Sequence, residues 1–174
     1  AQCAQATALI RLGQTPGRCG GARIRVHRAS SPGTGMSFDL QFWGTRASYP
    51  FFTPAHAGLG GDTSCVGLSV AGSRLFIDAG TGLMHAEPGD GHDIIVLSHF
   101  HLDHVLGLPY FLGKKQRGTL SLASAHCASA TDLRERIGSI YGGLGFPVSL
   151  GQIAPLLEFV HIPAAVSYTH LRAH

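Results

Sequence analysis

The feature that most constrains this chain is the stretch DIIVLSHFHLDH, residues 93–104. In it a continuous apolar run leads directly into His99, His101, Asp103 and His104. Such a run is typical of a strand buried on both faces. Imidazoles and a carboxylate beside a buried strand would carry a desolvation penalty of roughly several kcal/mol unless something pairs with them. The stretch therefore predicts a ligand for these side chains at the end of a buried strand.

The spacing of the four side chains favours divalent metal ions as that ligand. Strand side chains repeat every two residues, so His99 and His101 share one side, while Asp103 and His104 fall in the following turn. Imidazole and carboxylate suit zinc, manganese or iron, and the stretch has no thiol to indicate a purely structural zinc site. This pattern predicts one metal held by His99 and His101 and a second held by Asp103 and His104. Metals roughly 3.5–4 Å apart activate a water and clamp a scissile phosphate or carbonyl.

The other histidines lack partner spacing of this kind, and a surface position or a local hydrogen bond is the simpler interpretation for them. They are His27, His56, His85, His92, His126, His161, His170 and His174.

Composition narrows the class of protein. A chain of 174 residues is long enough for one domain with its own core. Its 24 glycines indicate many tight turns rather than a helical bundle. Charged residues make up only 13%, but the longest apolar segment is interrupted by the His99–His104 cluster, so no membrane span is expected. The four cysteines form no C-x-x-C pair and the N-terminus lacks a secretory signal, which favours a cytoplasmic setting.

The basic residues are concentrated in the first 35 positions, which hold five arginines and no acid. Residues 36–174 hold eight Lys or Arg against ten Asp or Glu, a balance of −2. With no long basic patch interleaved with aromatic residues, a nucleic-acid partner is not favoured. We interpret residues 1–35, which show no sustained periodicity, as a disordered or non-native leader, and Met36 as the natural start.

Short strands recur from there on. We predict strands in residues 38–43, 65–70, 74–78, 93–98, 119–124 and 157–162. Ser129, with Asp132 three residues later, predicts the start of a helix that ends at Gly142-Gly143. A shorter helix is expected to begin at or just after Asp103 and to break near Pro109. Strands with interspersed helices indicate an α/β (α+β) domain.

The cluster and its flanks resemble a known family. His99-x-His101-x-Asp103-His104 is similar to the signature of the metallo-β-lactamase superfamily. The blocks FWGTRASYP, GGDTSCVGLSV, FIDAGTGL and LSHFHLDHVLGLPYF resemble, in order and spacing, its branch of metal-dependent hydrolases and cyclic-phosphodiesterase-like proteins. The resemblance covers about residues 37–163, with Ala47 where the branch usually has glycine and Asp62 where it usually has asparagine.

The resemblance implies a four-layer αββα sandwich with the site at one edge between its two sheets. It implies two divalent metal ions, zinc being favoured over manganese or iron, on His99, His101, Asp103 and His104. Asp103 would also act catalytically by orienting or deprotonating the attacking water. Asp78, which ends its strand, would support the metal loop by hydrogen bonds to the ligands. The alternative for Asp78 is an aspartate that only ends a strand and binds nearby amides.

The family also supplies a third histidine, a bridging aspartate and a last histidine from its C-terminal half, and this sequence shows no match to them. We therefore interpret residues 36–163 as the N-terminal portion of the domain and residues 164–174 as a non-native tail. The favoured function is a phosphodiesterase for small cyclic nucleotide-like phosphodiesters, inactive in this fragment. An inactive metal-binding module, a thioesterase or lactonase, and an RNA-processing hydrolase are the alternatives. An unfinished sandwich exposes a sheet face, which favours a homodimer.

Overall fold

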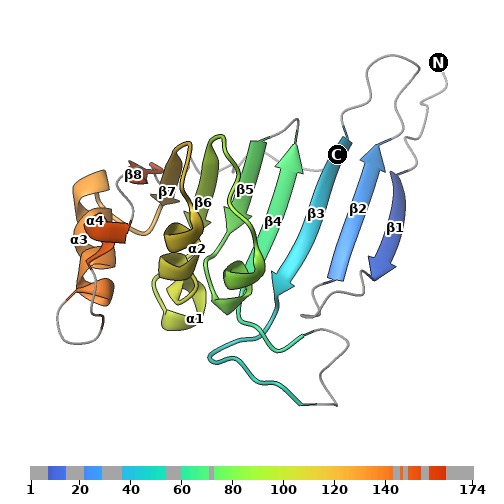
Figure 1. The fold of residues 1–174 in the computed structure, drawn as a ribbon, viewed down its shortest axis with the longest axis horizontal. Helices are drawn as coiled ribbons and strands as arrows, with labels where there is room; N and C mark the ends of the chain where they lie inside the picture. The colour runs from blue at the N-terminus through green and yellow to red at the C-terminus, as the bar shows by residue number, and fades with distance from the viewer. Residues whose placement is uncertain are drawn as a thin grey trace, which may run out of the picture.

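The computed structural model describes residues 8–14, 22–28, 37–53, 60–70, 73–142, 146, 149–153 and 157–163. Their strands form one eight-stranded sheet whose spatial order follows the chain (Figure 1). Strands β1 to β5 pair antiparallel, and β5 to β8 pair parallel. The bounds are β1 Ala8–Gln14, β2 Ala22–Arg28, β3 Ser37–Gly44, β4 Cys65–Val70, β5 Ser73–Ile77, β6 Asp93–Leu97, β7 Leu120–Ser124 and β8 Leu157–His161.

Along the chain, the helices occur in the connections between consecutive parallel strands, where crossover connections usually contain a helix. They are the 3-10 helix η2 Thr81–His85, α1 Leu102–Val105, α2 Leu108–Lys114, α3 Ala130–Tyr141 and α4 Leu150–Ile153. The six strands predicted from residue 38 onward and the helix capped at Ser129 are confirmed. The Ser129 hydroxyl accepts a hydrogen bond from the Asp132 N–H at 3.1 Å, and Gly142 follows the last turn.

The helical break expected near Pro109 falls just before it, and a second helix that the sequence did not indicate begins there. Helix α1 ends at Val105, and α2 starts at Leu108 with the proline in its first turn. Proline is tolerated there because the first N–H groups of a helix need no intrahelical acceptor.

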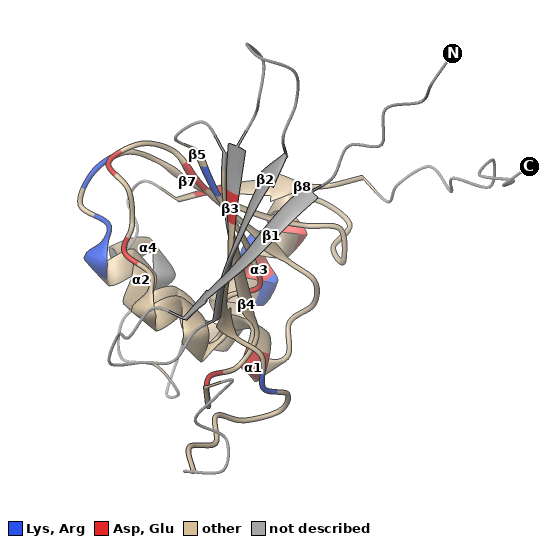
Figure 2. Cartoon of the chain, turned by 90° about the vertical axis from the view of Figure 1, so that its right-hand side faces the viewer, with Lys and Arg blue, Asp and Glu red and all other residues tan. Residues whose placement is uncertain are grey.

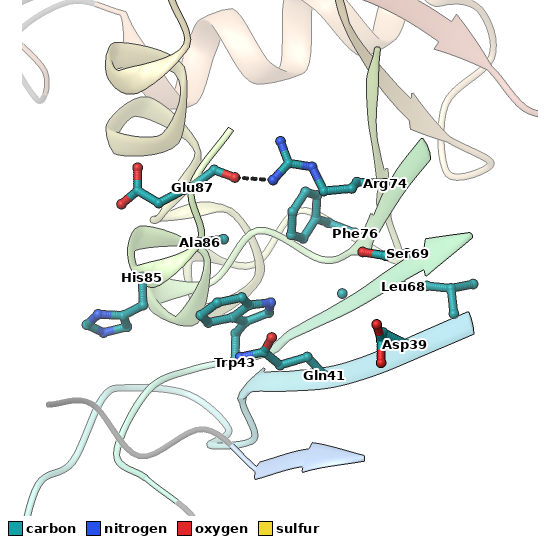
Figure 3. Close-up of a pocket in the computed structure, with 11 residues that line it drawn as sticks. Asp39, Gln41, Trp43, Leu68, Ser69, Arg74, Phe76, His85, Ala86 and Glu87 are labelled. Carbon is teal, nitrogen blue, oxygen red and sulfur yellow. Dashed lines mark hydrogen bonds between the residues drawn. The ribbon is translucent and has the colours of Figure 1, made fainter. Parts of the chain in front are cut away.

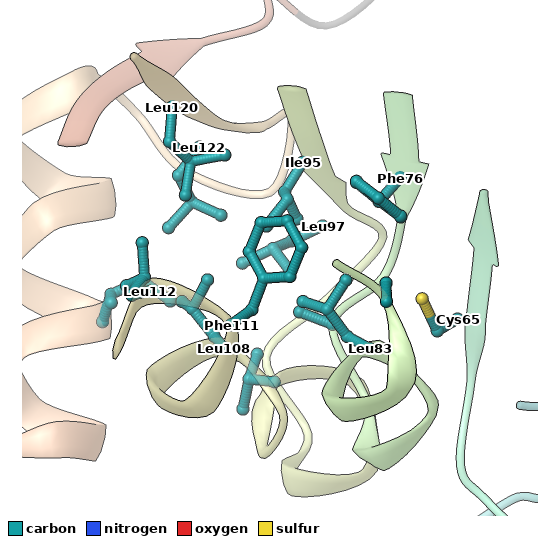
Figure 4. Close-up of a cluster of buried hydrophobic side chains, with 14 of the residues drawn as sticks. Cys65, Phe76, Leu83, Ile95, Leu97, Leu108, Phe111, Leu112, Leu120 and Leu122 are labelled. Carbon is teal, nitrogen blue, oxygen red and sulfur yellow. The ribbon is translucent and has the colours of Figure 1, made fainter. Parts of the chain in front are cut away.

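One face of the sheet carries the hydrophobic core. Phe76, Ile95 and Leu122 occupy paired positions on β5, β6 and β7 and point to this face. Phe111 of α2 and Leu133 of α3 are fully buried in the same cluster (Figure 4). Figure 2 shows α2 and α4 on one side of the sheet. None of the helices that the structure describes has the length and apolar character of a membrane span.

Strand β6 differs from the prediction that it is buried on both faces. Asp93, Ile95 and Leu97 are buried, whereas Ile94 and Val96 on the opposite face are only half-buried, and Ile77 of neighbouring β5 is 45% exposed. The helices and the core lie on the first face, so burial alternates along the strand. Of the expected four-layer sandwich, the described residues form one sheet and one helical layer.

Two strands lie within the predicted leader. Strands β1 and β2 extend the sheet beyond β3, with Ile24 opposite Leu40 and Val26 opposite Phe38. The structure therefore contains regular backbone where we expected none. Whether residues 1–35 are native to the domain stays a prediction, and residues 164–174 lie outside the described residues.

A buried ion cluster fixes the end of β6 that is remote from His99. The Asp93 carboxylate is 2% exposed and accepts hydrogen bonds from Arg74 Nε at 3.0 Å, Lys115 Nζ at 3.0 Å and the Gly89 N–H at 3.1 Å. Lys115 Nζ also donates to the carbonyl oxygens of Gly89 and Gly91. Two cations on one carboxylate thus tie the loop before β6 to α2 and β5.

Candidate metal centre

The polar cluster lies where two parallel strands end. Strand β5 is followed by Asp78 and β6 by Ser98 and His99, so these side chains meet at the carboxyl edge of the sheet. Carboxyl edges of parallel strands are where ligands bind in open α/β sheets. Helix α1 begins one residue after His101 and brings Asp103 and His104 to the same edge.

Close backbone packing holds α1 against the residues that follow β5. The Ala79 N–H donates to the His104 carbonyl at 2.7 Å, and the Gly107 N–H donates to the Ala79 carbonyl at 2.8 Å. A Cβ on Gly80 would overlap the Asp103 carbonyl oxygen and the Thr63 hydroxyl. Glycine is required there because only a residue without a side chain lets the two backbones approach this closely.

Asp78 is the hub of the cluster. It is 5% exposed, and its φ of 62° is unusual for a residue other than glycine. Its Oδ1 accepts hydrogen bonds from the Ser98 N–H at 2.8 Å and the Ser98 hydroxyl at 2.7 Å. Its Oδ2 lies 2.8 Å from His104 Nδ1 and accepts from the Ser64 hydroxyl at 3.3 Å. The carboxylate therefore contacts a cluster histidine directly, beyond binding nearby amides.

These contacts orient the His104 ring. Its Nδ1 lies 2.8 Å from Asp78 Oδ2, and because an ionised carboxylate only accepts, this contact favours a proton on Nδ1. The other ring nitrogen, Nε2, faces Asp103 Oδ2 at 3.3 Å. A cation between Nε2 and Oδ2, either a proton or a metal ion, would satisfy both atoms.

Asp103 is held from outside the cluster as well. Its Oδ2 accepts a 2.8 Å hydrogen bond from the Ser48 N–H, in the loop that follows β3. Desolvation alone would raise the pKa of Asp103, but the Ser48 hydrogen bond and the His104 imidazole lower it overall. Asp103 is thus ionised at neutral pH, which is the form that ligates metals.

His99 lies against both other histidines. Its ring centroid is 3.9 Å from that of His104 and 4.5 Å from that of His101, and its Nε2 is 3.1 Å from His101 Nδ1. Desolvation, followed by repulsion from His104 and His101, lowers the pKa of His99. A neutral imidazole is the form that a divalent cation needs.

The structure brings all four predicted ligand residues together but groups them differently from the spacing argument. Ligand atoms of His99, Asp103 and His104 lie within 4.8 Å of one another, whereas His101 is exposed and contacts His99. Converging acceptors, a neutral imidazole and an ionised carboxylate fit a divalent cation. Which residue binds which ion stays a prediction.

The sequence did not indicate the residues that support the cluster. Ser48, Ser64 and Ser98 come from three separate loops. Ser48 and Ser64 each donate one hydrogen bond, to Asp103 and Asp78 respectively, and Ser98 donates two to Asp78. Serines have no distinctive spacing, and only the place of Ser98 directly before His99 offered a signal.

Asp62 holds the loop that contains Ser48 in place through hydrogen bonds. Its carboxylate lies 3.0 Å from His85 Nε2 and accepts from the Thr81 hydroxyl at 2.9 Å, while its carbonyl accepts from the N–H groups of Thr45 and Arg46. Asp62, which departs from the asparagine usual in the branch, therefore keeps an ordered turn. The local hydrogen bond predicted for the remaining histidines is confirmed for His85, and for His92 with Thr119.

A separate pocket of about 300 Å³ lies over β3, β4 and β5 on the face that η2 covers (Figure 3). Trp43, Phe76 and His85 line it, and the Arg74 side chain at its rim donates to the Glu87 carbonyl. None of the four predicted metal ligands lines this pocket. The candidate metal centre therefore lies outside this pocket.

The prediction that Asp78 orients His104 is testable with asparagine, which keeps its size and tolerates a positive φ. Asp78→Asn is expected to weaken zinc affinity about 10- to 100-fold, since partners that orient metal ligands contribute this much. Zinc titration calorimetry would measure it, with Asp90→Asn, at an exposed loop position, as the matched control. A loss below about threefold in Asp78→Asn would contradict the orienting role.

Comparison with known proteins gives a family match. The sequence profile of the metallo-beta-lactamase superfamily matches residues 58–162. A ribonuclease Z from a Bradyrhizobium species is 32% identical over 127 residues, which cover 68% of this chain and 40% of that protein. A ribonuclease Z from Halorubrum lacusprofundi is 30% identical over 129 residues, which cover 69% of this chain and 39% of that protein.

A third relative has a different name and aligns over a shorter part of the chain. The cleavage and polyadenylation specificity factor subunit 3 of Dictyostelium discoideum is 35% identical over 74 residues, which cover 36% of this chain and 10% of that protein. No solved structure matches the chain. The matched residues amount to 40% or less of each of these relatives, and all four predicted metal ligands fall within the matched profile.

Proposed function

The chain belongs to the metallo-beta-lactamase superfamily, and from that premise we propose that it carries the first metal-binding motif of a metal-dependent phosphodiesterase that cleaves RNA. The observation that carries this proposal is the convergence of His99, Asp103 and His104 on one point, with His104 oriented by the buried Asp78. Such a set of acceptors suits a divalent cation, and zinc is the cation favoured here.

RNA is chosen over other substrates because of the relatives. Both ribonuclease Z sequences align over more than two thirds of the chain. The resemblance to the cyclic-phosphodiesterase-like branch favours a small cyclic phosphodiester, and both substrates contain a scissile phosphodiester bond. The proposed reaction is therefore still phosphodiester hydrolysis, but the proposed substrate is RNA instead of a small cyclic phosphodiester.

The described residues have definite roles in this proposal. His99, His101, Asp103 and His104 hold the metal ions, and Asp78 keeps the His104 proton on Nδ1. Bound divalent cations would make a water molecule more acidic and offset the negative charge of the phosphodiester. Asp103, fixed through Oδ2 by Ser48, would orient that water and accept its proton. Ser64 and Ser98 keep Asp78 in place.

The test is hydrolysis of an end-labelled RNA oligonucleotide, a cyclic mononucleotide and bis(p-nitrophenyl) phosphate with added zinc or manganese. Both the 174-residue chain and the product of its natural gene should be assayed. We expect the natural gene product to cleave RNA. His101→Ala should abolish cleavage, whereas His126→Ala, at an exposed histidine after β7, should leave it unchanged.

Each other outcome has a definite meaning. Activity in the natural gene product but not in the 174-residue chain would identify this chain as a metal-binding but inactive module. Preference for the cyclic mononucleotide would return the assignment to small phosphodiesters. Failure of every preparation to cleave any phosphodiester would overturn the proposed function.

A further inference from the structure

Several exposed aromatic side chains lie beside the candidate metal centre, in a segment that we call the aromatic loop, residues 48–52. Tyr49, Phe51 and Phe52 are 63%, 45% and 67% exposed. Large exposed apolar side chains gathered in one place mark a binding surface more often than scattered ones do. The question is what binds there.

The position of the loop is fixed relative to Asp103. The Ser48 N–H donates to Asp103 Oδ2, and Ser48 adopts a left-handed φ of 67°. The side chain of the next residue, Tyr49, therefore starts within a few bonds of a predicted metal ligand. A non-glycine residue held at positive φ next to a site is typical of backbone that function constrains.

Both ends of the loop are also held. The Thr45 and Arg46 N–H groups donate to the Asp62 carbonyl at 3.0 and 2.9 Å, and the Phe51 N–H donates to the Gly61 carbonyl at 2.8 Å. The Phe52 ring packs on the backbone of Gly61, where a Cβ would overlap it. The rings thus stand on an ordered segment, which lowers the entropy cost of binding.

The charge and ring chemistry of the loop select a ligand class. Residues 44–53 contain Arg46 and no acidic residue. Aromatic rings beside a phosphodiester-cleaving centre suit nucleobases, since every base has a flat π face that stacks on Tyr or Phe without sequence preference. A purely aliphatic partner would not require aromatic side chains in the loop. A purely anionic partner would require more positively charged side chains than Arg46 alone.

We propose that Tyr49 and Phe52 form a stacking platform for the nucleobases that flank the scissile phosphodiester of an RNA substrate. This inference rests on the proposed function, because it gives a binding site to the bases next to the phosphodiester bond that the metal centre is proposed to cleave. The sequence argued against a nucleic-acid partner for lack of a basic patch, whereas stacking relies on aromatic side chains and needs few cations.

The test is a binding measurement that does not depend on turnover. Fluorescence anisotropy would give the affinity of the zinc-loaded protein for a labelled single-stranded RNA oligonucleotide and for the same strand with abasic riboses. The double variant Tyr49→Ala/Phe52→Ala is expected to bind the RNA about 10- to 100-fold more weakly, and the abasic strand less than about threefold more weakly. Tyr49→Trp/Phe52→Trp should restore RNA affinity, because a larger ring still stacks.

Tyr110→Ala is the control, since Tyr110 is a 52% exposed aromatic side chain on α2 outside the loop. Equal weakening for the two strands, or no weakening for RNA, would overturn the platform. Selective weakening for a cyclic mononucleotide, with RNA binding unchanged, would also overturn it as an RNA site. Base-dependent binding without any hydrolysis would leave the platform standing and refute only the phosphodiesterase.

Discussion

Replacement of His104 by alanine is expected to lower zinc affinity by on the order of 100-fold or more, because removing only the partners of metal ligands already costs 10- to 100-fold. His104 contacts Asp78, Asp103 and His99. Its Nδ1 meets Asp78, its Nε2 meets Asp103, and its ring lies 3.9 Å from that of His99. Its loss removes a ligand and leaves the Asp78 carboxylate without its cluster partner.

Thermal unfolding with and without zinc would measure the effect. A ligand at 100 times its Kd stabilises a protein by about 2.7 kcal/mol, and at one Kd by only about 0.4 kcal/mol. At a zinc concentration 100 times the Kd of the unchanged chain, the Tm of that chain should rise clearly, while the Tm of His104→Ala should show almost no shift. His126→Ala is the control, as its side chain is exposed beyond β7. Full zinc stabilisation of His104→Ala would contradict the assignment.

Replacement of Asp93 by alanine is expected to destabilise the fold by about 3–5 kcal/mol, because it leaves the buried Lys115 ammonium without its counter-charge. Asp93 and Lys115 have side chains only 2% and 3% exposed, and Arg74 contacts the same carboxylate. Native domains have roughly 5–15 kcal/mol of stability in total, so this loss is a large share of it.

Urea unfolding of the metal-free proteins would give the free energies of unfolding of the unchanged chain and of Asp93→Ala, and the difference between them. Glu87→Ala is the matched control, because Glu87 pairs with Lys114 while its side chain is 77% exposed, and exposed pairs contribute about 0–1 kcal/mol. If Asp93→Ala does not fold, Asp93→Asn gives the same comparison. A loss equal to that of Glu87→Ala would contradict the role of the buried cluster.

Local patterns in the sequence were sufficient for most of the fold. Apolar runs bounded by turn residues predicted the strands from β3 to β8, and a serine cap with a glycine stop predicted α3. The break expected near Pro109 is present, but the helix that begins there was not predicted, because a proline that ends one helix is equally suited to the first turn of the next. Strand β2 was missed although its residues alternate strictly, as Ile24 and Val26 do with Arg23 and Arg25.

The candidate metal centre was predictable only in its local part. His99, His101, Asp103 and His104 lie within six positions, so their proximity follows from the sequence. The contacts of Asp103 with Ser48 and of Asp78 with His104 join residues 55 and 26 positions apart. No short-range pattern specifies such pairs, and the proximity of His99, Asp103 and His104 also depends on how α1 packs against the residues after β5.

Metal content of the purified 174-residue chain tests the central claim most directly. The chain should be dialysed against zinc, freed of excess ion, and measured by elemental analysis beside a His99→Ala/Asp103→Ala/His104→Ala variant of the same chain. We predict at least one zinc ion per unchanged chain and none above background in the triple variant. A folded, unchanged chain that retains no zinc, or a triple variant that retains as much, would contradict the account.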